Sequence, residues 1–212
     1  MSPVPETVPE TYEARVQTSR ERRRLAQVRK SFDAGMTLKA NGKSIDQQFF
    51  MACVAYIKES MDRLHAQDQR IHDFLLPHVT AGDDHAKTLE VLDVRLAKSR
   101  EALDALVAAA EAYAQADEAG WPDFQAAVAA FMQVYMNILL NGQHSTLTLQ
   151  EEVFDEHTWD QVAGVTPASL ALEDGLYAKV QGLAPEGADP VSFVGSRPAP
   201  GAGAPGKQAP RP

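Results

Sequence analysis

Four of the chain's six histidines fall within one stretch, "DRLHAQDQRIHDFLLPHVTAGDDH", which covers residues 62–85. Acidic residues lie between these histidines, and a mixture of imidazole and carboxylate suits iron, manganese or zinc. Cys53 is the only cysteine in the sequence, so a thiolate metal cage and an internal disulfide are both excluded. Metal chemistry in this stretch would therefore depend on histidine and carboxylate donors.

The spacing of three of these polar residues is helical. His65, Asp68 and His72 are separated by three and four residues, which places their side chains on one face of a helix. Asp68 occupies a position of the apolar stripe itself, where a carboxylate is costly to bury without a positive partner. A metal ion would supply that charge, and so would a protonated histidine or an arginine from a neighbour. Without a metal, Asp68 is a buried acid paired with His65 or His72.

The elements that must position these residues are helices. Apolar residues recur in alternating steps of three and four, which predicts amphipathic helices over residues 44–77, 83–120 and 121–153. Pro77 and Gly120 mark the ends of the first two. Each helix would be roughly 45 Å long at 1.5 Å per residue, and the short connections make neighbours antiparallel.

Two further helices are predicted beside these three. One covers residues 10–32 and has a thin apolar stripe; the other covers residues 166–180, with Thr166 as N-cap and Pro167 in the first turn. No alternation with a period of two predicts a strand. The predicted fold class is all-α, an up-down helical bundle of three long antiparallel helices plus shorter N- and C-terminal helices.

Composition divides the chain into three parts. Residues 1–43 form a basic helical segment, residues 44–183 the helical bundle domain, and residues 184–212 a tail rich in Pro, Gly and Ala. Such a tail buries too little apolar surface to order itself, so we expect it to be disordered. Its one apolar patch, "VSFVGSRP", is a candidate docking peptide for a protein partner.

Charge is unevenly distributed along the sequence. The net charge is -9, yet residues 1–43 carry nine Lys and Arg against five Asp and Glu. The acidic remainder argues against nucleic acid as a partner. The basic stretch "RERRRLAQVRK" (20–30) is either a solvated helix face or a contact with an anionic partner or with the acidic body itself.

Neither a membrane span nor a secretory signal is predicted. No run of about 18 uncharged apolar residues exists, and the start "MSPVPETVPE" lacks a basic segment followed by an apolar one. We therefore expect a cytoplasmic protein. The oligomeric state is left open by the sequence.

The antiparallel arrangement brings further polar residues to the height of His65, Asp68 and His72. His85 would lie roughly 7 Å from the same end of the bundle, with His144 roughly 18 Å and Glu151 roughly 8 Å from it on the third helix. The histidines in or beside turns, His78 and His157, are expected at the surface. The candidate metal site therefore consists of His65, Asp68, His72, His85, His144 and Glu151.

Three segments carry a family resemblance: "LHAQDQRI" (64–71), "DDHAKTLEVL" (83–92) and "QHSTLTLQEE" (143–152). Together they resemble the hemerythrin-like HHE family over roughly residues 45–165. The resemblance implies a bundle in which histidines and carboxylates hold a non-haem di-iron centre that binds, activates or senses dioxygen or another oxidant. Iron is the implied metal, and manganese or zinc would fit the same donors.

The sequence departs from the family pattern at two positions and lacks one ligand. The family places glutamate four residues after each late-helix histidine, whereas this chain has Gln69 and Thr148 there. No histidine precedes His65, so the ligand from the first helix is missing. A second hypothesis follows, in which the chain is a metal-free helical-bundle binding or assembly module that contacts partners through its basic N-terminal helix and tail.

Overall fold

The computed structural model describes residues 10–140 and 146–193. Within these ranges the secondary structure is helical and no strand occurs. None of the described helices has both the length and the apolar composition needed to cross a bilayer. The all-α class predicted from the periodicity is confirmed.

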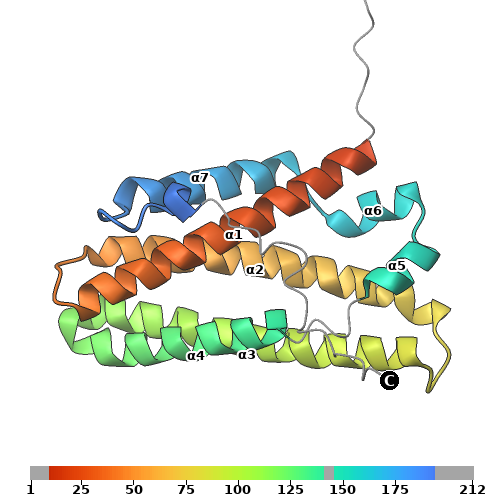
Figure 1. Ribbon diagram of the computed structural model, residues 1–212, viewed down its shortest axis with the longest axis horizontal. Helices are drawn as coiled ribbons and strands as arrows, with labels where there is room; N and C mark the ends of the chain where they lie inside the picture. Colours follow the sequence, from red (N-terminus) through yellow and green to blue (C-terminus); the bar gives the residue numbers. More distant parts are fainter. Residues whose placement is uncertain (1–9, 141–145, 194–212) are drawn as a thin grey trace, which may run out of the picture.

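The helices are, in chain order, α1 (Glu10–Ala40), α2 (Gln47–Leu75), α3 (Asp84–Ala116), α4 (Trp121–Leu140), α5 (Leu147–Val153), α6 (Glu156–Ala163) and α7 (Pro167–Leu183), with 3-10 turns η1 (Leu76–His78), η2 (Asp117–Gly120) and η3 (Pro190–Phe193). Helices α3 and α4 lie on one side of α2, and α7 lies on the other side (Figure 1). Helix α1 crosses over α2, and α5 and α6 cover the end where α2 turns into α3 (Figure 1).

Capping side chains explain where several helices begin. Asp46 accepts a hydrogen bond from the Gln48 amide at 2.9 Å, and Asp83 accepts one from the Ala86 amide at 2.7 Å. Thr166 and Ser169 form a capping box at the start of α7. The N-cap predicted for Thr166 is therefore confirmed, and the N-cap of α3 is Asp83.

The N-terminal helix is longer than predicted. The stripe that ends at Phe32 predicts a short helix, whereas α1 continues to Ala40 and is 31 residues long. The reason is that Met36, one turn after Phe32, is also buried in the core. Gly35 allows this packing, because a Cβ there would lie 2.4 Å from a ring carbon of Phe49 on α2.

The third long helix is shorter than predicted. A single helix over residues 121–153 was expected from the apolar pattern, whereas α4 ends at Leu140 and a separate helix, α5, begins at Leu147. Because α4 and α5 are separate helices, the height estimated for Glu151 no longer follows from a continuous rise, and His144 lies outside the described residues.

The packed part of the chain extends beyond α7. Residues 184–193, which belong by composition to the tail, lie against α1. Ala188 and Pro190 are buried, and the Ser31 hydroxyl on α1 donates a hydrogen bond to the Ala188 carbonyl. The remainder of the predicted tail lies outside the described residues.

The main core is an aromatic cluster at one end of the bundle. It joins four helices through Phe32 of α1, Phe50 of α2, Tyr113 of α3 and Phe124 of α4. The Tyr113 and Phe124 rings stack with centroids 5.0 Å apart, and Phe32 and Phe50 lie 6.1 Å apart. Fully burying each such ring contributes about 1.5–3 kcal/mol, so this cluster holds the four helices together.

A smaller core lies at the opposite end, where α2 turns into α3. It consists of Ile71, Leu75, Leu89, Leu149 and Val162, and thus connects α2, α3, α5 and α6. Arg70 closes the end of α6 by donating to the carbonyls of Val162 at 3.0 Å and Ala163 at 3.3 Å. Gly164 follows in the left-handed conformation, with φ of +64°.

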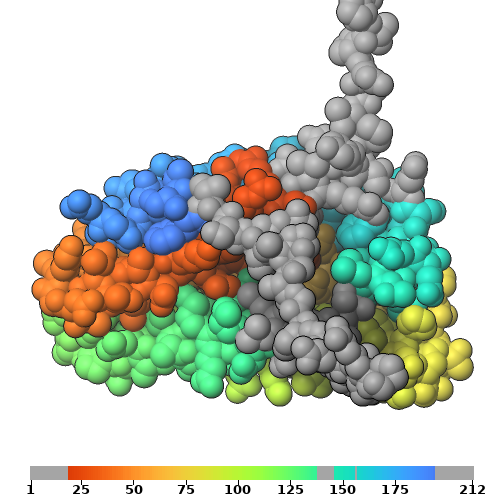
Figure 2. Space-filling view, viewed as in Figure 1, coloured from red at the N-terminus to blue at the C-terminus, as the bar shows by residue number. Residues whose placement is uncertain are grey.

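A buried polar cluster fixes α7 on α1 and α2. Glu173 of α7 is 1% exposed, and accepts from the Tyr56 hydroxyl at 2.5 Å and from Arg24 at 2.6 Å. Asp174 accepts from both Arg20 and Arg24. The basic stretch of α1 thus contacts the acidic body of the same chain, and Figure 2 shows α1 and α7 as one continuous surface.

Replacing Gly164 with alanine should destabilise the fold. A Cβ at this position would lie 2.1 Å from a guanidinium nitrogen of Arg70, on a backbone that disfavours side chains. We expect Gly164→Ala to lower the free energy of unfolding by about 1–2 kcal/mol, measured by urea denaturation. Gly175→Ala is the matched control, because no atom lies within 4 Å of its Cβ position on α7. It should be neutral or stabilising, and equal losses in both variants would contradict this account.

Alkaline pH should weaken the fold through Tyr56. Burial, followed by the hydrogen bond to Glu173, raises the pKa of Tyr56 far above its usual value. The resulting stability is complete below about pH 10, the value for an unfolded tyrosine, and is lost as the pH rises above it. Tyr56→Phe should reduce the loss above that pH by up to about 1.4 kcal/mol per pH unit, measured by urea denaturation. Other groups contribute to the remaining slope, among them Cys53, Tyr113 and Tyr177, whose pKa values burial also raises; an unchanged slope would sink the assignment.

Candidate functional site

The predicted site residues are distributed along three helices. His65, Asp68 and His72 lie on α2, His85 at the start of α3 and Glu151 on α5. His144 lies outside the described residues. The contacts of each residue decide whether the set can act together.

His65 is directed into the interface between α2 and α3. It is 5% exposed, and its Nε2 lies 2.8 Å from the Ser99 hydroxyl on α3. Its Nδ1 is buried and has no hydrogen-bond partner, a situation that costs about 1–3 kcal/mol. Burial, and then the charge of Arg100, lowers the pKa of His65, so the ring is neutral at pH 7.

His72 has a different environment. It is 8% exposed, with Nδ1 3.1 Å from Asp73 and Nε2 3.3 Å from Asp93 on α3. Both of its ring nitrogens are therefore beside carboxylates that reach the surface. These contacts join α2 to α3 independently of His65.

His85 is nearest to a different acid of α5 from the one expected. Its Nε2 lies 3.8 Å from Glu152, with the two side chains 40% and 58% exposed. Glu151 points to solvent. Of these two adjacent glutamates, Glu152 and not Glu151 therefore lies beside α3.

Asp68 is balanced by arginines from neighbouring helices. Burial raises the pKa of Asp68, while Arg22 of α1 and Arg95 of α3 oppose that rise. The contacts of His65 and His72 described above do not include Asp68. Of the positive partners considered for this acid, the arginines are the ones that the fold supplies.

The described donors do not fit one metal centre. No group of three or more His, Cys, Asp or Glu side chains in residues 10–140 and 146–193 is arranged to hold a metal ion. His85 and Asp93, the partner of His72, are eight residues apart on α3, or roughly 12 Å. The His72 and His85 contacts are therefore separate.

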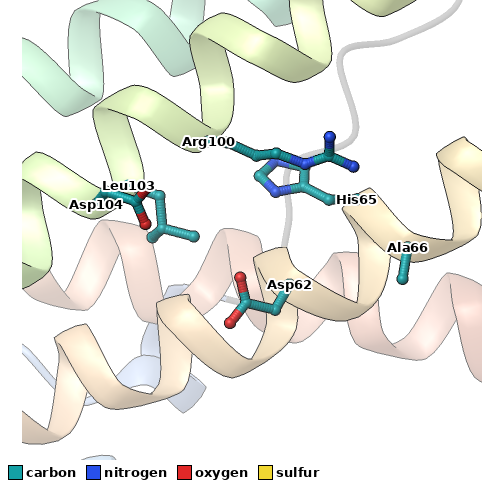
Figure 3. Close-up of a pocket in the computed structure, with 6 residues that line it drawn as sticks. All are labelled: Asp62, His65, Ala66, Arg100, Leu103 and Asp104. Atoms are coloured by element: carbon teal, nitrogen blue, oxygen red, sulfur yellow. The ribbon is translucent and has the colours of Figure 1, made fainter.

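A small pocket opens beside His65, in the middle of the α2–α3 interface. It has a volume of about 240 Å³ and is lined by Asp62, His65, Ala66, Arg100, Leu103 and Asp104. Figure 3 shows the imidazole ring and both carboxylates directed toward the same space, with the Leu103 side chain between them. The pocket therefore combines two acids, one neutral histidine, one guanidinium and an apolar surface.

The charges at this pocket are only partly engaged. Asp62 pairs with Lys58 at 2.5 Å, an exposed contact within one helix that contributes little. Arg100 donates to Gln69 at 3.4 Å, which is long for a hydrogen bond. Asp104 makes no hydrogen bond or ion pair with the described part of the chain.

Sequence reasoning missed Ser99, Arg100 and Asp104. The signal for Ser99 was available, because it is a polar residue on the apolar stripe of α3 between Leu96 and Leu103. No spacing in the sequence groups a nucleophile with a base, whereas the fold brings Ser99 Oγ to His65 Nε2. Ser99 does not line the pocket, and no third group orients Nδ1 of the ring. The pair therefore lacks the arrangement that a hydrolase needs.

No family model, curated protein or solved structure matches the chain. The hemerythrin-like resemblance therefore depends on the quoted sequence segments alone.

The titration of His65 should report its buried setting. Because its pKa is lowered, the NMR shift of its imidazole C–H protons should change with a midpoint below about 6.5, the value for a free histidine. Its neutral form contributes stability that is complete above that pH and is lost as the pH falls below it. Arg100→Gln should raise the midpoint. A midpoint at or above the free value would contradict the described environment.

Proposed function

We propose that this chain is a metal-independent helical-bundle binding protein whose ligand site is the pocket between α2 and α3. One observation carries the proposal: a buried histidine with an unpartnered Nδ1 lines a pocket that also collects incompletely paired charges. Small-ligand sites typically combine an apolar surface with a few convergent polar groups. We further propose that α1 is the fourth member of an up-down bundle with α2, α3 and α4.

The contacts of the histidines favour binding over a shared metal centre. His65, His72 and His85 each have a separate partner: Ser99, the Asp73–Asp93 pair and Glu152. Gathering their nitrogens around one ion would require all of these contacts to break. The family resemblance implies an iron centre that binds dioxygen. This stays a prediction, and the measurement of metal content described below tests it.

Protein partners remain a second part of the proposal. Arg20 and Arg24 are occupied by Asp174 and Glu173 and Arg22 faces Asp68, which leaves the exposed Arg23 and Lys30 of α1 for an anionic partner. A docking role for the tail and a cytoplasmic location stay predictions from the sequence, because the described residues do not test them.

Metal content separates the two functions. We expect protein purified from medium supplemented with iron, manganese and zinc to contain far less than one ion per chain, measured by elemental analysis. Because no metal would contribute to folding, a chelator should leave the thermal midpoint unchanged. Near-stoichiometric metal that is lost in both His65→Ala and His85→Ala would establish the metal centre instead.

Ligand binding at the pocket is tested separately by NMR. A library of small fragments of varied charge should include members that shift the backbone amides of residues 62–66 and 99–104 and leave those of α6 and α7 unchanged. The variant Ala66→Gln, which puts a longer side chain at the exposed wall of the pocket, should weaken these shifts. If no fragment perturbs these amides, the pocket is not a binding site.

A further inference from the structure

The polar groups at the His65 pocket form a set of hydrogen-bond acceptors. The carboxylates of Asp62 and Asp104 supply two of them. When Nε2 of His65 carries the proton and donates it to Ser99, the lone pair on Nδ1 is a third. Figure 3 shows these three side chains converging on one space from α2 and α3.

We infer that this pocket, the site of the proposed function, takes a small zwitterion in which a short alkyl chain joins a protonated primary amine to an anionic group. A primary ammonium carries three N–H donors and no acceptor, which matches two carboxylates and one imidazole nitrogen. Hydrogen bonds from an ammonium to a carboxylate are charge-assisted and stronger than neutral ones.

Arg100 decides between a zwitterion and a simple amine. Arg100 lines the same pocket, and its positive charge would repel a ligand that carries only positive charge. Since its single described hydrogen bond, to Gln69, is long, it is available to pair with a carboxylate or phosphate group. The two charges of the ligand are then complementary to those of the pocket, because the ammonium lies at the two acids and the anionic group lies at Arg100.

The remaining lining residues set the size and the apolar character of the ligand. Ala66 is exposed and offers apolar surface for a short alkyl chain, next to the buried side chain of Leu103. The volume of about 240 Å³ is below the range of about 300–1,000 Å³ typical for drug-sized molecules. A divalent cation is not the inferred ligand, because no three of the described acids and histidines lie close enough together to coordinate one ion, and coordination needs shorter distances than hydrogen bonds to an ammonium.

The test is an NMR titration of the ¹⁵N-labelled full chain with three probes of matched length: 4-aminobutanoate, butylamine and butanoate. We expect 4-aminobutanoate to give saturating shifts at the amides of residues 62–66 and 99–104, with a Kd at least about tenfold below that of either singly charged probe. Glycine and 6-aminohexanoate, as shorter and longer zwitterions, show which separation of the charges fits best.

Three variants assign the charges. Asp104→Asn should weaken the binding of 4-aminobutanoate by about tenfold, and Arg100→Gln should remove its advantage over butylamine. Asp33→Asn, which changes an exposed carboxylate on α1, is the matched control and should change neither value.

The outcomes separate this inference from the proposed function. Equal binding of butylamine or butanoate at the same amides would overturn the ligand class and leave the pocket as a binding site. The absence of shifts with every zwitterion would also overturn the inferred ligand class. The fragment library then decides whether the pocket is a binding site at all.

Discussion

The interlocking of aromatic rings from α1, α2, α3 and α4 is the contact on which the arrangement of the other elements depends. Phe50 lies at its centre, within 6.1 Å of the rings of both Phe32 and Phe124. The close approach of α1 to α2 at Gly35 brings Phe32 and Met36 into this cluster. With four helices fixed at one end, α2 and α3 continue side by side toward the other, and the His65 pocket forms on their shared face.

The interface between α2 and α3 changes character along its length. It is aromatic at the first end, polar in the middle at His65 and Ser99, and aliphatic at the second end at Leu75 and Leu89. Because α4 stops at Leu140, the second end is covered by the short helices α5 and α6. The polar middle is where the packing leaves an unpaired nitrogen and a pocket.

Local sequence signals predicted the helices well because helix formation follows local patterns. The stripe on α2, the cap at Thr166 and the stop at Pro77 each depend on residues within a few positions of one another. The length of α1 was underestimated because its stripe is thin, and only Phe49 from another helix shows why Gly35 and Met36 continue it.

The partners of the candidate residues were harder to predict. Helical phase correctly placed His65 inside, but which acid or hydroxyl meets each histidine depends on the rotation of one helix against another. A rotation of one residue on α5 makes the difference between Glu151 and Glu152 beside His85. Asp68 illustrates the same limit, because its arginines come from α1 and α3, neither of which is near it in sequence.

The surroundings of α1 have a consequence for the order of folding. Arg20 meets Asp174 across 154 residues, and Ser31 meets Ala188 across 157. Contacts of such long separation form late, because closing the intervening loop costs entropy before the contact contributes. Helix α1 thus gains these contacts only after residues 174–188 have emerged from the ribosome, and until then Arg20 and Ser31 lack these partners.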